Sequence, residues 1–423
     1  MESEYITVSW LDPLRRRLTK PQWQNLILLI VAVQFARTFI GRQLALDLIC
    51  LISSSSCYRR LERLLSMGEK VPRLLQRTWV RLVLRVFAPG RGRLNVLIDW
   101  TWHRDRCRSL WLMLPVGGRA VALAFFLAPP KLSGPGSQRA FEDEALKQLR
   151  EWLPRGRRVL LIGDRGFGGR DRVRFLKEQG FQYLVRVNGD TQIFLGKKWR
   201  PLSQWAPPLG QRRHVEEVLV GKFQPHERVS VNVIAVHQTL LFPKRVLTNK
   251  GKPTGKTITE TTWFLLTDLP PETDAVALYR QRMQVEESFR DYKSLFGLEA
   301  ERTKQPWERL GMLLWAMMIG MAFDLSLGGA AGQRTRAPRI SPEAQEAPSP
   351  AIPWYRSESV TREGLHEMVV QLVLGSSPFT AVLRAIAAKS RRMQARQQVR
   401  NRRQETPAPR HRTQAQAKIH LRA

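Results

Sequence analysis

Between residues 94 and 187 the sequence alternates short apolar runs with amphipathic stretches in an order that few folds accommodate. Three apolar runs come first, each bounded by charged, Gly or Pro residues, and helix, strand, helix and strand patterns follow them. The segments are Leu94–Ile98, Leu110–Leu114, Ala120–Leu127, the helix Gln138–Trp152, the strand Val159–Ile162, the helix Gly169–Gln179 and the strand Phe181–Val187. This βββαβαβ order predicts an α/β sheet with an antiparallel start.

The flanking sequence divides the chain into further parts. From Pro21 to Val86 apolar residues recur three or four positions apart, which predicts an all-helical N-terminal domain over residues 1–92, expected to bind DNA. In the domain 93–327, residues 189–268 alternate in the manner of strands and predict a β-rich insertion long enough for a subdomain of its own. A long helix is expected from Asp274 to Phe296, and residues 328–423 predict a linker, short helices and a disordered basic tail.

The charge balance points to a polyanionic partner. The 423 residues include 69 Lys and Arg against 36 Asp and Glu, a formal net charge of +33. Such a surface repels itself unless it meets a polyanion, since each cation near a phosphate releases condensed counterions. Nucleic acid is therefore the leading partner, and charge alone leaves open a basic membrane-surface or ribosomal protein. The 43% of hydrophobic residues excludes a disordered basic peptide.

Other features argue against export and against a membrane. The three cysteines, Cys50, Cys57 and Cys107, form no Cys-x-x-Cys pair, which favours a reducing compartment over a disulfide framework or a zinc site. The N-terminus lacks the pattern of a signal peptide. Two apolar stretches, residues 26–52 and 310–327, contain charged residues, so we expect buried helices rather than membrane spans.

Two aspartates follow predicted strands directly. Asp99 stands at the end of the first strand and Asp164 at the end of the fourth. In an α/β sheet the strand ends gather functional sites, and neighbouring strands can bring two such carboxylates together. Two close carboxylates repel unless they are protonated or bridged by a cation such as magnesium. The ordinary alternative is that each aspartate caps a turn, and for either one alone that alternative is favoured.

A polar stripe on the predicted long helix adds a third carboxylate. Tyr279, Arg282, Glu286 and Lys293 fall within about 60° of one another at about 100° per residue. Glu287 falls about 80° from the first of them, so Glu286 is the better candidate for a third metal ligand.

These positions carry a resemblance to a known family. The spacing Tyr-x2-Arg-x3-Glu-x6-Lys resembles the signature of DDE transposases of bacterial insertion sequences of the insertion-sequence-four type, and Asp164-Arg165-Gly166-Phe167 is similar to the family segment around its second aspartate. The resemblance covers roughly residues 94–293, and Met283 departs from the tryptophan often found there. It implies an RNase H-like catalytic core with a β-rich insertion before the glutamate.

The resemblance also implies roles for the matched residues. The three carboxylates would hold two Mg²⁺ ions, with Mn²⁺ as a substitute, and would be the catalytic residues: Asp99, Asp164 and Glu286. The rest of the signature would contact the phosphate backbone at an element end: Tyr279, Arg282 and Lys293. Two metals can clamp an in-line displacement, one activating the attacking oxygen and the other stabilising the leaving oxygen.

Two further DNA contacts are expected, each with an ordinary alternative. Arg59, Arg60 and Arg63 lie on one side of a predicted helix and would lie along phosphates, or they form a solvated basic face. Trp263 resembles the family tryptophan that stacks on a base flipped out during hairpin formation, or it is a core residue of a strand.

The sequence thus predicts a transposase that cleaves double-stranded DNA at terminal inverted repeats and joins the freed end to target DNA. It would act in the bacterial cytoplasm at the nucleoid, as a homodimer that the resemblance alone implies, and without a membrane. One alternative is a noncatalytic DNA-binding relic, which the intact carboxylates argue against. Another is a basic protein that compacts nucleic acid, which would not need them.

Overall fold

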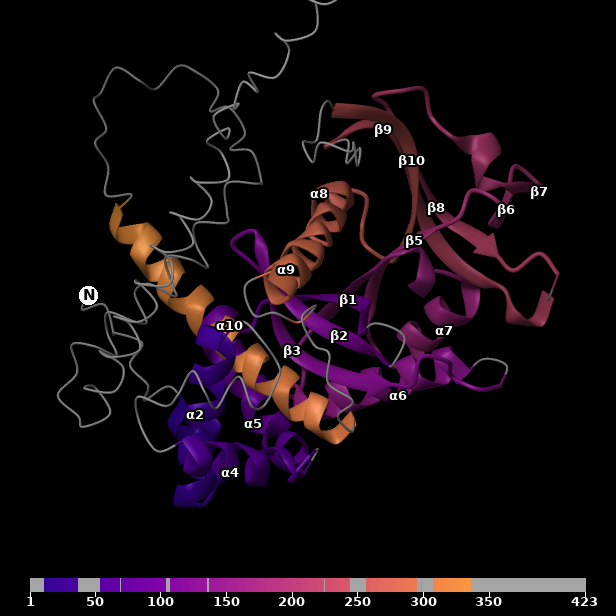
Figure 1. Cartoon of the computed structure of the whole chain (residues 1–423). Coiled ribbons are helices and arrows are strands. Elements are labelled where there is room, and N and C mark those ends of the chain that lie inside the picture. The colour runs from indigo at the N-terminus through magenta and orange to yellow at the C-terminus, as the bar shows by residue number, and fades with distance from the viewer. Residues whose placement is uncertain are drawn as a thin grey trace, which may run out of the picture. The chain divides into compact units, whose positions relative to one another are not determined.

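The computed structural model describes residues 11–36, 54–68, 70–103, 107–134, 137–223, 225–243, 256–294, 298 and 307–335 (Figure 1). All of them belong to the first of two units into which the chain divides, Met1–Met368 and Val369–Ala423. The predicted short helices and basic tail, and most of the predicted linker, lie outside the described residues.

Ten strands form one mixed sheet in the order β3-β2-β1-β4-β5-β10-β9-β8-β6-β7. The bounds are β1 Leu94–His103, β2 Cys107–Val116, β3 Arg119–Ala128, β4 Val159–Gly163, β5 Gln182–Val187, β6 Gln192–Leu195, β7 Lys198–Pro201, β8 Arg212–Val220, β9 Val229–Pro243 and β10 Lys256–Thr267. β1, β4 and β5 run parallel, whereas β2 and β3 are antiparallel to their neighbours. The first five strands confirm the predicted order and are consistent with an RNase H-like core.

The connections of the parallel strands are also those predicted. Helix α6, Ser137–Trp152, leads from β3 to β4, and α7, Arg170–Glu178, leads from β4 to β5. Every residue of β4 is buried. A continuous apolar strand of this kind is typical of a parallel strand that is covered on both faces.

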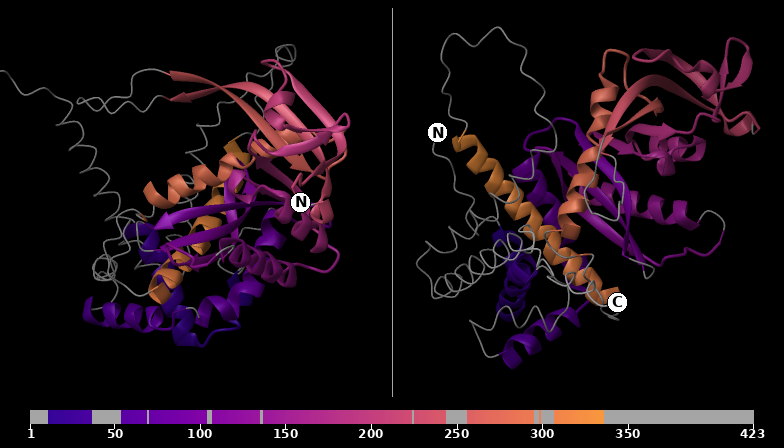
Figure 2. Two further views of the ribbon diagram at one scale, coloured as in Figure 1. Left: turned by 90° about the vertical axis from the view of Figure 1, so that its right-hand side faces the viewer. Right: turned by 45° about the horizontal axis from the view of Figure 1, so that its top comes forward.

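The β-rich insertion differs from the prediction because its strands do not form a separate sheet. β10 pairs antiparallel with β5, from Phe264 opposite Val187 to Thr267 opposite Leu184, so strands β6 to β10 extend the central sheet. An unpaired β5 edge would expose backbone donors and acceptors, and β10 satisfies them. The long β9–β10 hairpin is visible in both views of Figure 2.

The predicted long helix is interrupted. It consists of α8, Ala275–Arg280, and α9, Met283–Ser294. At the break the N–H groups of Gln281 and Arg282 donate to carbonyls three residues earlier, those of Leu278 and Tyr279, instead of four. This tighter turn places α8 and α9 out of register with one ideal helix, so the predicted single stripe is wrong in its detail.

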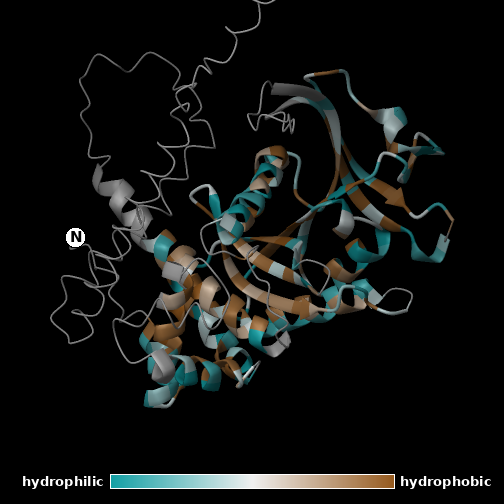
Figure 3. Ribbon diagram, in the orientation of Figure 1, coloured by the Kyte–Doolittle hydropathy of each residue, from teal (hydrophilic) through white to brown (hydrophobic). Residues whose placement is uncertain are grey.

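The N-terminal segment is helical, as predicted, and packs against a C-terminal helix. The helices are α1 Asp12–Arg15, α2 Lys20–Ala36, α4 Ser54–Leu65, α5 Lys70–Phe87 and α10 Trp307–Thr335. α10 contacts α2, α4, α5 and β3, and hydrophobic colours gather where these elements meet (Figure 3). α10 also continues past Leu327, where the sequence pattern predicts a linker.

α10 includes the stretch that resembles a membrane span. One window of the described helices, Arg309–Ser326, is long and apolar enough to cross a membrane, and 94% of it is buried inside the protein. The ring of Trp315 packs edge-on against Trp79 of α5, with centroids 6.4 Å apart. The burial agrees with the prediction of a core helix.

Candidate active site

Asp99 and Asp164 lie next to each other at one end of the sheet. β1 and β4 pair in parallel, and the last pair in register is Ile98 with Gly163. The residue after each member of this pair is an aspartate, and neighbouring strands lie about 4.8 Å apart. The parallel register therefore places the two carboxylates side by side. β4 ends at Gly163, directly before Asp164, whereas β1 continues to His103, so the prediction that Asp99 ends its strand is wrong.

The same row continues onto β5 with an arginine that the sequence analysis missed. Gly163 pairs with Val185, so Arg186 is level with Asp164. Burial lowers the pKa of Arg186, and the nearby guanidinium groups of Arg165 and Arg282 lower it further. The signal in the sequence is a single arginine in the otherwise apolar strand from Tyr183 to Val187, at the level of the second aspartate.

A tight turn holds Asp164. Its Oδ1 accepts a hydrogen bond of 2.8 Å from the N–H of Gly166, which starts a single 3₁₀ turn. The turn packs closely on β5, since a Cβ placed on Gly168 would lie 2.3 Å from the carbonyl oxygen of Arg186. Glycine at position 168 thus lets the loop after β4 reach the next strand.

Helix α9 docks on β3 by its polar face. The Ser288 hydroxyl accepts from the Ala120 N–H at 2.7 Å and donates to the Ala120 carbonyl at 3.1 Å. The fully buried Arg119 pairs with Asp291 at 2.7 Å and with Glu287 at 3.9 Å. Glu287 is therefore a structural residue inside the fold. The neighbouring glutamate, Glu286, lies on the other face of the helix.

Glu286 lies on that other face and is linked to Asp99 by one arginine. Arg282 Nη2 lies 2.5 Å from Glu286 Oε1, and Arg282 Nη1 lies 3.3 Å from Asp99 Oδ2. The side chains of Asp99 and Arg282 are each 16% exposed, whereas that of Glu286 is 45% exposed. The guanidinium therefore bridges two of the three predicted metal ligands.

The pKa of Asp99 depends on its burial and on the charges of the other two carboxylates. Burial and, to a lesser extent, the charges of Asp164 and Glu286 raise the pKa of Asp99 from 3.8 to about 6, against the lowering by Arg282. Asp99 is therefore repelled by the other two carboxylates, and Arg282 relieves only part of that repulsion. Like charges gathered in this way are the condition under which a cation binds.

Tyr279 and Trp263 form an aromatic pair beside this group. Their ring centroids are 5.0 Å apart at an interplanar angle of 71°, and both side chains are buried. The guanidinium of Arg186 lies 5.9 Å from the Trp263 ring centroid. Burial raises the pKa of the Tyr279 hydroxyl, which interacts with Arg282 and Arg186. Both rings thus contact each other instead of solvent.

Lys293 lies near His103, at the far end of β1. Burial and, to a lesser extent, the charge of Lys293 lower the pKa of His103 from 6.5 to about 4. His103 Nε2 lies 2.6 Å from the Ser109 hydroxyl. The remaining predicted DNA contacts, Arg59, Arg60 and Arg63, are exposed on α4, which packs on α2 and α10 and is not part of the carboxylate group.

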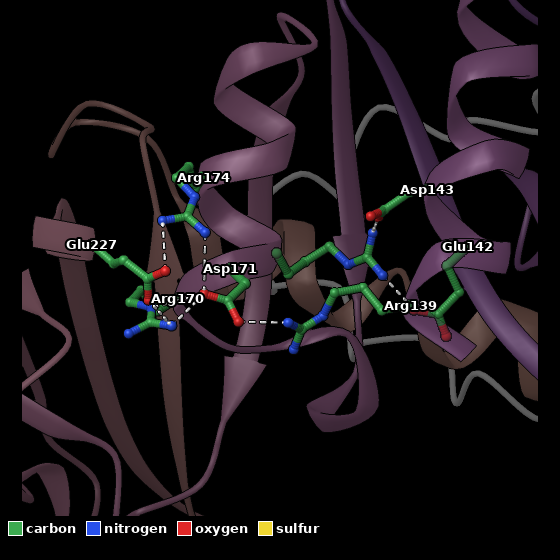
Figure 4. A network of polar contacts seen from close by, with 8 residues as sticks. Arg139, Glu142, Asp143, Arg170, Asp171, Arg174 and Glu227 are labelled. Carbon is green, nitrogen blue, oxygen red and sulfur yellow. Dashed lines mark hydrogen bonds and ion pairs between the residues drawn. The ribbon is translucent and has the colours of Figure 1, made fainter. Parts of the chain in front are cut away.

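A buried polar network supports β1 next to Asp99. The Trp100 indole N–H donates to Glu142 Oε1 at 2.7 Å, and Glu142 also pairs with the buried Arg172 of α7. Figure 4 shows this pair beside a second group of contacts, in which Arg170 joins Asp171 to Glu227, a residue of the sheet extension. The residue after Asp99 is therefore tied to α6 and α7, and α7 is tied to the sheet extension.

The described residues contain no ready-made metal site. Among the ranges that the structure covers, no group of three His, Cys, Asp or Glu side chains could hold a metal ion as they stand. Asp99 and Glu286 instead have the guanidinium of Arg282 as their common cation.

Comparison with known proteins bears on this arrangement. Residues 136–320 match the family described as the transposase DDE domain. The matched stretch includes Asp164 and Glu286 but begins after Asp99. A transposase DDE domain points to DNA transposition, and members of the family are typically catalytic and generally use divalent metals.

No protein of curated function matches the chain. Among solved structures, the chain is similar to the piggyBac transposase in a cryo-EM structure of its synaptic complex with hairpin DNA. That similarity has 13% identity and a TM-score of 0.42, and it covers 88% of this chain and 76% of the other.

Proposed function

We propose that this protein is a transposase that cleaves double-stranded DNA at the terminal inverted repeats of a mobile element and joins the freed end to target DNA. One observation carries the proposal. Asp99, within β1, is level with Asp164, which directly follows the neighbouring parallel strand β4, and Arg282 links Asp99 to Glu286 on α9. The match to the transposase DDE domain supports the same function.

The proposed catalytic residues are the three carboxylates, which would have to rearrange around a divalent metal, since Arg282 is bound to two of them in the structure. They offer the oxygen ligands that Mg²⁺ prefers. Burial, and to a lesser extent the charges of Asp164 and Glu286, raises the pKa of Asp99. Two bound Mg²⁺ ions, or Mn²⁺ in their place, would activate the attacking oxygen and stabilise the leaving oxygen. Asp99, Asp164 and Glu286 would hold these ions.

Arg282 has a second role in this proposal. Its guanidinium is bound to carboxylates in the structure, at 2.5 Å from Glu286 and 3.3 Å from Asp99. If the carboxylates held a metal ion instead, the guanidinium would be free beside them. Arginine binds phosphate through two parallel hydrogen bonds, so Arg282 would then hold the DNA phosphate, with Arg186 beside it.

The remaining signature residues are proposed as DNA contacts. Lys293 and Tyr279 would bind the phosphate backbone, and Trp263 would stack on a flipped base. The burial of Tyr279 and Trp263 against each other means that DNA must separate their rings for these contacts to form. Trp263→Ala should spare nicking of the first strand and impair hairpin formation. Normal hairpin formation in that variant would remove the stacking role.

The finer identity follows the sequence signature. We place the protein with the bacterial transposases of the insertion-sequence-four type, acting at the nucleoid in the cytoplasm as a homodimer that pairs two element ends. Arg59, Arg60 and Arg63, exposed on α4, would add contacts to the DNA backbone.

The test is a Mg²⁺-dependent cleavage assay on duplexes that carry the element's own flanking ends. Wild type is compared with Glu286→Gln and with a matched control, Glu144→Gln, which changes an exposed glutamate on α6. We expect cleavage by wild type and by the control, and a loss of at least about 100-fold in Glu286→Gln with DNA binding retained.

Other outcomes favour the alternatives. DNA binding without cleavage by any of the three proteins, in Mg²⁺ and in Mn²⁺, would indicate a noncatalytic relic. Equal condensation of DNA of any sequence, without cleavage, would indicate a basic compacting protein.

A further inference from the structure

A row of arginines follows the solvent side of α5. Arg77, Arg81 and Arg85 are four residues apart and exposed. The opposite side of the helix is fixed to the protein, because the Gln76 amide donates to the Leu123 carbonyl at 2.6 Å and the Trp79 indole to the Ala122 carbonyl at 3.1 Å. The arginines are thus held on a rigid support with their side chains outward.

This row borders a basic cleft between α5 and the end of α6. The cleft has a volume of about 910 Å³, and five cationic side chains line it against a single carboxylate, that of Glu151. The cations are Arg77, Arg81, Lys147, Arg150 and Arg155. Within the part of the chain that the structure covers, no ion pair joins Arg77, Arg81 or Arg155 to a carboxylate.

The local structure accounts for only part of this charge. Lys147 and Arg150 lie in the last turns of α6, where cations complement the helix dipole, and Arg150 also donates to the Arg157 carbonyl at 3.1 Å. Arg77 and Arg81 are in the middle of α5, where no such benefit exists. Cations gathered without partners repel one another, which lowers stability unless an anion joins them.

The cleft lies at the opposite end of β4 from the carboxylates. Gly156, which lines it, precedes the strand, and Asp164 follows the strand. The five residues of β4 span about 17 Å, so phosphates in the cleft are not those being cut.

We propose that this cleft and the α5 row bind the phosphate backbone of a DNA duplex segment remote from the site of cleavage. This proposal rests on the proposed function in one respect, that the protein binds double-stranded DNA, and it does not require that the protein cleaves DNA. Arg77 and Arg85 are about 12 Å apart along the helix, a length over which one DNA strand presents three or four phosphates. A membrane surface fits less well, because α5 buries its apolar face in the protein and Leu74 is its one exposed large apolar side chain.

The experiment measures binding of a duplex of about 30 base pairs to the full-length chain by fluorescence anisotropy in EDTA, at several salt concentrations. The variant is Arg77→Gln/Arg81→Gln/Arg155→Gln. The matched control, Lys198→Gln/Arg212→Gln/Lys222→Gln, removes three exposed cations from the sheet extension. We expect the variant to lose on the order of 10- to 100-fold in DNA affinity. The slope of log K, the association constant, against log salt should become less steep by about 2.7, or about 0.9 for each lost phosphate contact. The control should change much less.

A second variant and a second probe complete the test. Arg77→Lys/Arg81→Lys/Arg155→Lys should restore most of the affinity, since lysine also binds phosphate as a point charge. Equal weakening in the glutamine variant and its control would overturn the proposal, as would wild-type binding to phosphatidylserine vesicles that is tighter than to DNA and depends on these arginines. The outcome is independent of the Glu286→Gln result, so the proposed function and this surface can fail separately.

Discussion

Arg282 Nη1 lies 3.3 Å from Asp99 Oδ2, and the two residues are 183 positions apart in the chain. The same guanidinium reaches Glu286. The positive charge that the carboxylate group needs is therefore supplied by the protein itself until another cation arrives.

Removing that guanidinium should leave the carboxylates without their cation. Arg282→Ala is expected to lower the free energy of unfolding by about 1–3 kcal/mol at neutral pH without metal, because charge-assisted hydrogen bonds are lost. Millimolar Mg²⁺ should restore part of it. Urea unfolding with and without Mg²⁺ measures both effects, and Arg280→Ala, which alters an exposed arginine on α8, is the control. Equal Mg²⁺ responses in both variants would contradict the prediction.

Asp99→Asn should change the pH dependence of stability. The pKa of Asp99 is raised from 3.8 to about 6, so between these values the native state keeps a proton that the unfolded state has lost. This group therefore costs stability as the pH rises, up to about 3 kcal/mol above pH ~6. The variant should gain relative to wild type over that window in metal-free urea unfolding. A difference that is constant with pH would contradict the sign.

His103 should act in the opposite direction. Its pKa is lowered from 6.5 to about 4, first by burial and then by Lys293, so the unfolded state binds the extra proton between these values. Stability is therefore lost as the pH falls from about 6.5 to about 4. An NMR titration of the imidazole should have its midpoint near 4, and Lys293→Met should raise that pKa. A midpoint near 6.5 would be inconsistent with the buried position.

Glu142→Gln should be strongly destabilising although glutamine has the same shape. Glu142 and Arg172 are each 2% exposed and pair with each other, so the variant leaves a buried guanidinium with less compensation. A loss of about 3–5 kcal/mol in urea unfolding is expected. Glu144→Gln, at an exposed position of the same helix, should change stability by less than about 0.5 kcal/mol. Similar losses in both would show that the pair is not structural.

Gly168→Ala should displace the turn that carries Asp164. The added Cβ would lie 2.3 Å from the Arg186 carbonyl oxygen and 2.8 Å from Val187 Cγ1, so the backbone must move. We expect a loss of more than about 2 kcal/mol and a defect in cleavage. Gly92→Ala, where nothing lies within 4 Å, is the control and should be close to neutral. Wild-type stability in Gly168→Ala would show that the loop adjusts freely.

The strand order and the two aspartates could be predicted from the sequence because local patterns report them. The apolar runs from Leu94 to Val187 specify buried strands, and the carboxylates that follow two of these runs are neighbours because the two strands are parallel. Helical spacing favoured Glu286 over Glu287 as the third metal ligand, and in the structure Glu287 pairs with the buried Arg119. The metal and DNA roles of these residues stay predictions that the cleavage assay tests.

Features that depend on contacts between distant segments could not be predicted. The helix break at Gln281 and Arg282 has no proline or glycine to announce it, and the insertion joins the central sheet only because β5 offers a free edge to β10. Arg186 lies at the candidate site only because β4 and β5 pair in a register that places it level with Asp164.

The sequence by itself determined the order of the core strands and helices and the choice of Asp99, Asp164 and Glu286 as candidates, since hydrophobic periodicity and helical spacing act over a few residues. Only the tertiary structure decided that Arg282 bridges Asp99 and Glu286, that Trp263 and Tyr279 cover each other, and that α5 and α6 form a basic cleft. Those relationships arise from packing and charge between segments far apart in the chain, which no local pattern encodes.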